Sequence, residues 1–278
     1  MTLLDVVLLA IIQGFAELLP VSSSAHVIMA EKLLGLDPTA PAMTFLLVML
    51  HTGTMFAVIG YFWNVWRERY FASAAVFRQQ ARLIIIATAA TGVVGLVLML
   101  VIQRIVLRGH AHAQVEQLFG NPYLIASGLV AAGVLILLSS RKAITDQPLN
   151  NRRSVWIGAI QGLCLPFRGF SRSGATISTA LLLGVERMRA EEFSFALAVV
   201  LTPPVVVREA WRLVHADAAT GALVGRAFEM GLLGMLFSFV AGWLALRWLS
   251  RWLEHGRWHF FGYYCLVAAV LVLTISFW

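Results

Sequence analysis

The stretch QGFAELLPVSSSAH, residues 13–26, decides how this chain folds, together with its later counterpart QGLCLPFRGFSRSGATIS, residues 161–178. Each stretch places ionisable and hydroxyl side chains in a segment that is otherwise apolar enough to enter a bilayer. A charged side chain at the centre of a membrane helix costs about 2.5–3.5 kcal/mol, so such groups persist only where they are paired, hydrated or used. Both stretches open with Gln-Gly and reach a proline before a serine-rich turn, which indicates one structural unit that occurs twice.

The composition is that of a polytopic membrane protein. Of the 278 residues, 60% are hydrophobic and 13% are charged, whereas about 25% are charged in a typical soluble domain. The net charge of +7 comes from short basic clusters beside long apolar runs. Such clusters are typical of topology signals and of contact with anionic lipids, so no nucleic-acid partner is expected.

Six apolar runs are long enough to cross about 30 Å of hydrocarbon as full helices. The two motif stretches instead predict pairs of short helices, 2–19 with 22–35 and 154–165 with 171–185, each pair broken at its proline turn. Short interrupted pairs in matching positions of two halves point to re-entrant hairpins. The six predicted spans are residues 42–62, 83–106, 122–140, 193–214, 228–249 and 260–278.

These elements predict an all-α polytopic membrane protein whose single membrane domain, residues 1–278, contains two inverted repeats. Each repeat is a re-entrant broken-helix hairpin plus three transmembrane helices, because three spans per half invert the second half. The repeats cover about residues 1–140 and 154–278, joined by the cytoplasmic loop 141–153. Arginines and lysines in predicted loops after residues 62 and 140 assign those loops to the cytoplasm and the N-terminus to the periplasm. In the first loop these residues are Arg67, Arg69, Arg78 and Arg82.

The first stretch offers residue types suited to nucleophilic chemistry. Gln13 and Glu17 lie four residues apart, on one face of the predicted helix. After the break, Ser23 and His26 are three residues apart, which is the spacing at which a helical turn aligns a nucleophile with a base. We therefore expect Ser23 to be activated by His26.

The second stretch repeats this arrangement with added positive charge. Ser171, Arg172 and Ser173 stand at a predicted helix start, and Thr176 follows one turn later. A helix start directs free backbone N–H groups and the positive end of the helix dipole toward an anion. Two opposed hairpins would bring both helix starts together at the membrane centre, with Arg172 and Arg168 adding charge. That field suits a phosphate or a diphosphate.

Structural explanations compete with these roles. A catalytically idle ion pair is the alternative for Glu17 and Arg172, and a buried core histidine is the alternative for His26. His51, in the segment LHTGT at residues 50–54, is expected to be structural rather than catalytic. Three serines are equally well explained as helix caps or as groups that pack helices: Ser22, Ser24 and Ser173.

The chain resembles the undecaprenyl-diphosphate phosphatase family of the bacitracin-resistance type. The resemblance covers nearly the whole chain and rests on ELLPVSSSAH at 17–26 and GFSRSGATIS at 169–178, supported by EFSFALAVVLTPP at 192–204. It implies a multi-pass enzyme of the bacterial inner membrane that hydrolyses undecaprenyl diphosphate to undecaprenyl phosphate and phosphate. That reaction recycles the lipid carrier of cell-wall glycan precursors and confers bacitracin resistance.

The resemblance also implies roles for single residues. Ser23 is the expected nucleophile, with His26 as its partner and direct attack by water as the alternative. Glu17 is the acidic member, which orients His26, holds a metal ion or positions water. The residues expected to bind the diphosphate are Arg172, Ser171, Ser173, Thr176, Ser22, Arg168 and Gln13.

The chain departs from the family pattern at two positions. Gln13 stands where many relatives have a second glutamate, so a two-carboxylate metal site is not expected. Mg²⁺ or Ca²⁺ is a candidate cofactor, held by Glu17, phosphate oxygens and water. PFRGFSRSG stands where relatives often read WPGFSRSG, and the added Arg168 is either a phosphate ligand or a cap of the turn.

The expected partners are a polyprenyl diphosphate lipid and the surrounding membrane lipids, with no nucleic acid. A homodimer is one candidate oligomeric state. The alternative function is a lipid-phosphate flippase, because inverted repeats with broken helices at the membrane centre are also a transporter architecture.

Overall fold

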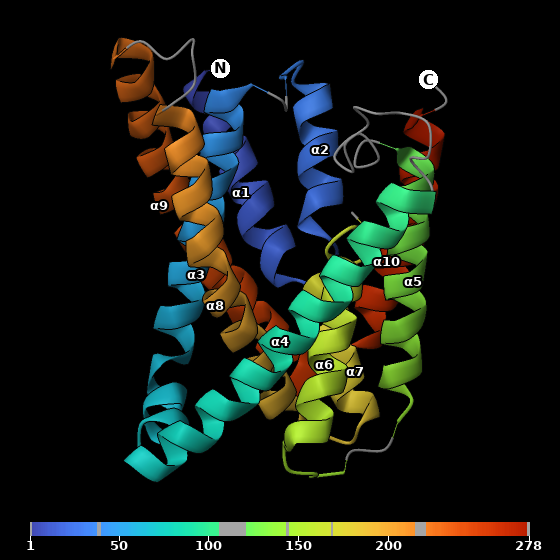
Figure 1. The fold of residues 1–278 in the computed structure, drawn as a ribbon. Coiled ribbons are helices and arrows are strands. Elements are labelled where there is room, and N and C mark those ends of the chain that lie inside the picture. Colours follow the sequence, from blue (N-terminus) through green and yellow to red (C-terminus); the bar gives the residue numbers. More distant parts are fainter. Residues whose placement is uncertain are drawn as a thin grey trace. The chain divides into compact units, whose positions relative to one another are not determined.

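The computed structural model describes residues 2–37, 40–105, 121–142, 145–167, 169–214 and 221–276. Within these ranges the chain forms ten α-helices (Figure 1), and a single β-bridge joins Gln147 to Val185. The helices are α1 (Leu3–Leu18), α2 (Ser23–Leu33), α3 (Pro41–Tyr70), α4 (Ala74–Ile105), α5 (Pro122–Ser140), α6 (Asn151–Cys164), α7 (Arg172–Leu182), α8 (Arg187–Val214), α9 (Gly221–Glu254) and α10 (His259–Ser276).

Each predicted full span lies within one helix: α3, α4, α5, α8, α9 or α10. Five of these helices are long and apolar enough to cross a membrane, and α10 contributes a shorter apolar stretch, His259–Ile275. The prediction of an all-helical, multi-pass membrane protein is therefore confirmed. Residues 106, 277 and 278, at the ends of two predicted spans, lie outside the described part.

Both motif stretches form broken helices, as predicted. The chain leaves α1 at Leu18 and resumes as α2 at Ser23, and it leaves α6 at Cys164 and resumes as α7 at Arg172. These four helices have 16, 11, 14 and 11 residues. At about 1.5 Å per residue, none of them reaches across the hydrocarbon of a bilayer.

The predicted loop after residue 62 is wrong. Arg67 and Arg69 lie on α3, and Arg78 and Arg82 lie on α4. A hydropathy window marks only the apolar part of a helix, whereas the helix continues for as long as its residues favour helical geometry. Arginine, glutamine, glutamate and alanine, which fill this segment, are good helix formers.

The helices form two compact units, which are described separately. Unit 1 contains α1, α2, most of α3, the second half of α8 and most of α9. Unit 2 contains α4 to α7, the first half of α8, α10 and the turn Pro20–Ser22. The boundaries are Met1–Leu19, Ser23–Asn64 and Ala198–Leu249 for unit 1, and Pro20–Ser22, Val65–Leu197 and Ser250–Trp278 for unit 2.

In unit 1 the core joins the first hairpin to α3. Val6, Leu9 and Ala10 of α1 are fully buried, and they pack in one cluster with Leu46 and Leu50 of α3. Leu9 and Ala10 follow Val6 by three and four residues, so the three side chains form one apolar stripe of that helix. Burial of this stripe holds the end of α1, which carries Glu17, against α3.

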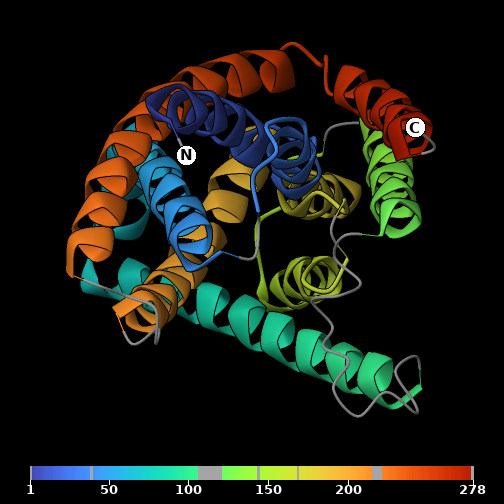
Figure 2. The same cartoon turned by 90° about the horizontal axis from the view of Figure 1, so that it is seen from above.

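In unit 2, α6 lies against α4 and α5 lies against α10, and Figures 1 and 2 agree on both pairs. The approach of α6 to α4 depends on Gly158, because a Cβ atom there would lie 2.0 Å from the carbonyl oxygen of Ala87. The hydroxyl of Thr91 on α4 also donates to the Gly158 carbonyl at 2.9 Å. Small residues of this kind let membrane helices pack closely.

We expect Gly158→Ala to destabilise the protein, because the new methyl group forces α6 away from α4. Overpacking of this kind costs roughly 1–3 kcal/mol. Gly92→Ala is the matched control, since a Cβ atom on Gly92 of α4 meets nothing within 4 Å. Thermal unfolding of the detergent-purified variants measures the difference, and equal midpoints for the two variants would contradict the expected clash.

Candidate functional site

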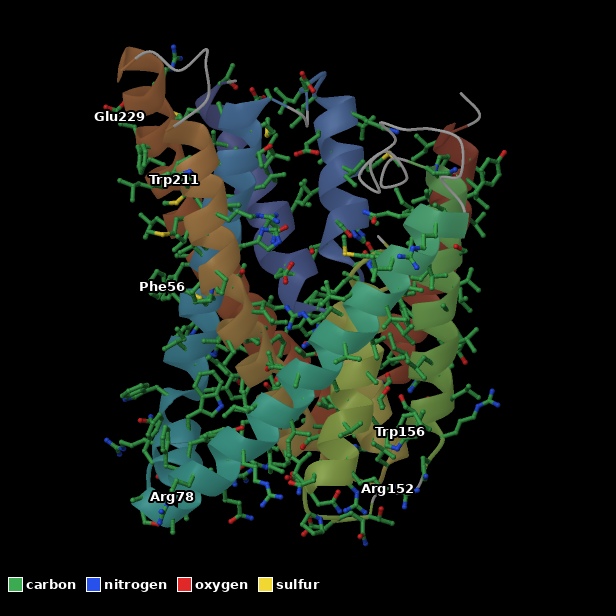
Figure 3. The ribbon with its side chains drawn as sticks, in the orientation of Figure 1. Phe56, Arg78, Arg152, Trp156, Trp211 and Glu229 are labelled. Carbon is green, nitrogen blue, oxygen red and sulfur yellow. The ribbon has the colours of Figure 1, made fainter. Side chains whose placement is uncertain are left out.

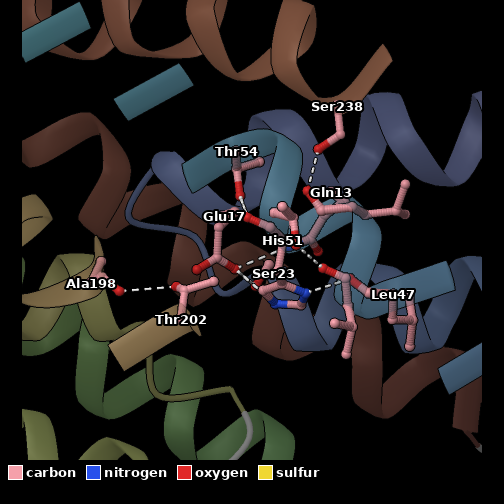
Figure 4. A network of polar contacts seen from close by, with 12 residues as sticks. Gln13, Glu17, Ser23, Leu47, His51, Thr54, Ala198, Thr202 and Ser238 are labelled. Atoms are coloured by element: carbon pink, nitrogen blue, oxygen red, sulfur yellow. Dashed lines mark hydrogen bonds and ion pairs between the residues drawn. The ribbon is translucent and has the colours of Figure 1, made fainter. Parts of the chain in front are cut away.

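The first cluster of site residues lies in unit 1, where α1 ends and α2 begins. The hydroxyl of Ser23 donates a hydrogen bond to Oε2 of Glu17 at 2.6 Å. The side-chain amide of Gln13 donates to the same oxygen at 3.2 Å (Figure 4). The structure thus brings together three residues of the first motif, with the hydroxyl directed at a carboxylate.

His51 of α3 completes this cluster. Its Nε2 atom lies 3.4 Å from Oε2 of Glu17, and its Nδ1 atom lies 2.7 Å from the carbonyl oxygen of Leu47. A carbonyl oxygen can only accept, so Nδ1 carries a proton. An attractive contact between Nε2 and the carboxyl group then requires one further proton, held either by His51 or by Glu17. Glu17 therefore stands between the hydroxyl of Ser23 and the imidazole of His51.

The contact of His51 with Glu17 was not predicted from the sequence, in which His51 was expected to be structural. His51 lies on a different helix from the motif, so no spacing rule connects it with Glu17. The available signal was an ionisable residue within an apolar span, which is functional by default. About 44% of the His51 side chain is exposed, against 16% for Glu17.

His26 lies on α2, one turn beyond Ser23, and its side chain is half-buried. The spacing of the two residues predicts that His26 takes the proton of Ser23. The hydroxyl of Ser23 instead donates to Glu17, which puts a carboxylate in the position of the base. The catalytic part of His26 stays a prediction.

The turn between α1 and α2 is strained at Ser22. This residue has a φ of +68°, and among the described residues it alone has a positive φ without being glycine. The left-handed conformation costs an L-residue about 1–2 kcal/mol. Such strain concentrates at functional sites, where the surrounding structure enforces it.

Contacts within unit 2 hold this turn. The carbonyl oxygen of Pro20 accepts a hydrogen bond from the thiol of Cys265 at 3.2 Å. A Cβ atom on Gly174 of α7 would lie 3.2 Å from Cβ of Pro20. The turn that precedes Ser23 therefore packs beside the first turn of α7, which carries the second motif.

The second cluster is the buried start of α7. Ser171 is the N-cap, and its hydroxyl accepts a hydrogen bond from the backbone N–H of Gly174 at 3.2 Å. The hydroxyls of Ser171 and Ser173 lie 3.4 Å apart. Arg172 is the first residue of the helix and is half-buried. A buried helix start with hydroxyls and a guanidinium has the chemistry of an anion site.

Thr176 fastens this helix to α8. Its hydroxyl donates to the carbonyl of Arg172 at 2.8 Å and lies 2.6 Å from the hydroxyl of Ser194. Both Thr176 and Ser194 are fully buried. Ser194 belongs to the segment 192–204 that supports the resemblance, so this segment positions the helix that carries Arg172.

The predicted site residues thus fall into two clusters. Unit 1 holds Gln13, Glu17, Ser23 and His26, whereas unit 2 holds the turn at Ser22 and the helix start of the second motif. Arg168 lies outside the described residues. That both clusters serve a single site stays a prediction.

The first cluster offers one carboxylate, that of Glu17, to a metal ion. Among the described residues, no group of three or more histidines, cysteines, aspartates or glutamates is placed to hold a metal ion. The side chain of Gln13 presents its amide N–H group, not an oxygen atom, to Glu17. Glu17 is therefore the carboxylate that remains for a cation. Because Mg²⁺ and Ca²⁺ take about six or more oxygen ligands, an ion there would need phosphate oxygens and water.

Similarity to known proteins extends over the whole chain. A family model described as bacitracin resistance protein BacA matches residues 6–271. Undecaprenyl-diphosphatase 2 of Acinetobacter baylyi is 58% identical over 281 aligned residues, which cover 99% of each chain. The undecaprenyl-diphosphatases of Korarchaeum cryptofilum and Rhodopirellula baltica are each 30% identical, over 99% of this chain and 100% and 98% of theirs.

We expect Ser22→Gly to fold normally and Ser22→Val to be less stable, because a β-branched residue rarely adopts a positive φ. The valine variant should lose roughly 1–3 kcal/mol of stability. Ser24→Val is the control, because it places a valine at the second residue of α2, outside the strained turn. Thermal unfolding measures the stability of the three variants. Equal midpoints for Ser22→Val and Ser24→Val would show that the strain at Ser22 has no importance.

Proposed function

Because this chain belongs to the bacitracin resistance protein BacA family, we propose that it is an undecaprenyl diphosphatase that releases inorganic phosphate and leaves undecaprenyl phosphate in the membrane. The observation that carries the proposal is the 2.6 Å hydrogen bond from Ser23 to Glu17, which sets a hydroxyl against a base inside a membrane protein. The product is the lipid carrier of cell-wall precursors, and the family is associated with resistance to bacitracin.

In the proposed reaction the oxygen of Ser23 attacks the terminal phosphorus while its proton passes to Glu17. The bond from that phosphorus to the bridging oxygen breaks, and undecaprenyl phosphate leaves with the electron pair. Water then attacks the phosphorus of the phosphoserine, the bond from that phosphorus to Oγ of Ser23 breaks, and Glu17 returns its proton to Oγ as inorganic phosphate leaves with both protons of the water. A positioned base contributes about 10²–10⁴-fold to such a step. In the alternative, water attacks directly and Glu17 takes its proton.

Two histidines assist in this proposal. His51 shares a proton with Glu17. When His51 holds this proton it stabilises the ionised carboxylate, and when Glu17 holds it the neutral imidazole accepts a hydrogen bond from the carboxyl group. His26, one turn beyond Ser23, acts on the substrate phosphate as a proton donor. Mg²⁺ or Ca²⁺, bound by Glu17 and the diphosphate, would neutralise phosphate charge when present.

We propose that the second cluster binds the same diphosphate. Phosphoryl transfer depends mainly on positioning and on neutralising charged oxygens, which Arg172 and the start of α7 would supply. Ser171, Ser173, Thr176, Ser22, Gln13 and Arg168 are the further proposed substrate contacts.

We propose that the two halves are inverted repeats, with a re-entrant hairpin in each. The support is a recurring helix contact: a Cβ atom on Gly14 of α1 and one on Gly162 of α6 would each meet a carbonyl oxygen, a Cβ atom and a glycine nitrogen within 3.1 Å. The atoms met are Ser238 O, Ala241 Cβ and Gly242 N for Gly14, and Thr91 O, Val94 Cβ and Gly95 N for Gly162.

A second contact supports the same relation. A Cβ atom on Gly133 of α5 would lie 2.9 Å from the carbonyl oxygen of Gly262, and one on Gly262 of α10 would lie 3.0 Å from the carbonyl oxygen of Gly133. The third span of one proposed repeat thus lies against the third span of the other, with a glycine of each at the point of contact. With the basic segments in the cytoplasm, the proposed inner-membrane topology places the N-terminus in the periplasm.

We expect Ser23→Ala, Glu17→Gln and Arg172→Ala each to lower phosphate release from undecaprenyl diphosphate by roughly 10²-fold or more. Ser24→Ala, next to the nucleophile, is the control and should keep most of the activity. The assay measures phosphate released by purified protein with and without a chelator. Near-normal turnover of Ser23→Ala would favour direct attack by water, and near-normal turnover of all three would refute the proposed site.

The same assay tests the flippase alternative, which the names of the relatives do not support. A flippase moves lipid phosphate across vesicles without releasing inorganic phosphate. Lipid movement without phosphate release by the wild-type chain would therefore overturn the diphosphatase.

We expect His51→Ala to lower the rate of phosphate release by roughly tenfold or more, because Glu17 loses the group with which it shares a proton. Thr52→Ala is the matched control. Thr52 is the next residue on α3, and its hydroxyl donates only along its own helix, to the Val48 carbonyl at 2.8 Å. If the two variants retain equal activity, His51 is structural.

A further inference from the structure

Unit 2 carries a cavity that the proposed reaction does not use. Its volume is about 620 Å³, and it lies where α4 and α6 begin, in the size range of small-ligand sites. Figure 3 labels two of its arginines, Arg78 on α4 and Arg152 on α6, at the same end of the molecule. Its polar lining consists of Arg78, Gln79, Arg82, Asn150, Asn151 and Arg152.

The cavity is cationic and has no counter-charge. None of its lining residues is an aspartate or a glutamate. Within the ranges that the structure describes, the side chains of Arg78, Arg82 and Arg152 make no ion pair and no hydrogen bond. The adjacent Arg153, by contrast, donates to the carbonyl oxygens of Leu183 and Pro148. Three guanidinium groups without acidic partners create a field that attracts an anion.

The arrangement of the arginines suits phosphate groups. Arg78 and Arg82 are four residues apart on α4, so they are neighbours on one face of the helix. Guanidinium groups bind phosphate through paired hydrogen bonds. Arg152 adds a third positive charge from another helix, at the first turn of α6, where free backbone N–H groups also favour an anion. A ligand with more than one anionic oxygen group fills this lining better than a monovalent ion.

The surroundings of the cavity are those of a lipid site. Among the five helices long enough to span a membrane, α4 is the least buried, because only 17% of its most apolar stretch lies inside the protein. Phe77 and Ile85 of α4 flank the two arginines and are exposed, and Trp156 follows Arg152 by one turn of α6 and is exposed as well. Charged cavities bordered by apolar helix surfaces bind the head groups of anionic lipids.

We propose that this cavity binds the phosphate head group of an anionic phospholipid, with the acyl chains along the exposed face of α4. The site uses none of the residues assigned to phosphate release, and it does not depend on the diphosphatase assignment. Its ligand is structural or regulatory membrane lipid.

Native mass spectrometry of the detergent-purified full chain tests the proposal, with tetraoleoyl cardiolipin and dioleoyl phosphatidylcholine as probes. We expect the wild type to retain one cardiolipin in preference to phosphatidylcholine. The triple variant Arg78→Gln, Arg82→Gln, Arg152→Gln should bind cardiolipin roughly a hundredfold more weakly, at about fivefold per arginine.

The matched control is the triple variant Arg67→Gln, Arg141→Gln, Arg257→Gln, which removes the same charge from exposed positions of unit 2 outside the cavity. It should bind cardiolipin like the wild type. A lysine version of the cavity variant should recover part of the affinity, because the charge returns. Unchanged phosphate release by the glutamine variant shows that the chain is folded.

Two results would overturn the proposal: equal weakening by the cavity variant and the control variant, or no preference of the wild type for cardiolipin over phosphatidylcholine. A competition arm adds inorganic phosphate. If phosphate displaces cardiolipin from the wild type, the arginines recognise phosphate without the lipid chains. If phosphate does not displace it, the whole lipid is the ligand. Both competition results support a phosphate site.

Discussion

A helix that breaks off leaves backbone groups without partners in the helix itself, and much of this structure depends on how the protein satisfies those groups. At the second break, the hydroxyl of Ser171 accepts the N–H of Gly174. At the first break, the Pro20 carbonyl accepts from the thiol of Cys265. Glycine contacts such as that of Gly158 with α4 allow neighbouring helices to approach closely.

The same constraint supplies the chemistry. A protected helix end is a cluster of oriented dipoles in a place from which lipid is excluded, so a charged ligand interacts strongly with it. Hydroxyl groups that cap or pack the helices, such as Thr176 against Ser194, also position the guanidinium of Arg172. At the first break a carboxylate, a hydroxyl and a histidine converge on one oxygen atom of Glu17. Polar groups that are costly in a membrane are therefore concentrated at the two helix breaks, where a bound diphosphate would interact favourably with them.

Much of the fold was predictable, because hydropathy and proline act locally. The six spans and both breaks follow from apolar length and from the turns at Pro20 and Pro166. The basic segment after residue 62 was mistaken for a loop, since hydropathy reports the lipid-facing part of a helix and not its end. For the site, the hydrogen bond from Ser23 to Glu17 was not predicted, because it depends on the turn angle that the strained Ser22 sets.

The sequence by itself determined the membrane class, the helix breaks and the residues able to handle phosphate, because each follows from the order of neighbouring residues. The tertiary structure decided which of those residues meet. His51 reaches Glu17 because apolar stripes of α1 and α3 pack together, and three arginines line one cavity because α6 lies against α4. Such contacts depend on which faces of distant helices come together, and hydrophobic periodicity leaves that choice open, since any apolar face can bury another.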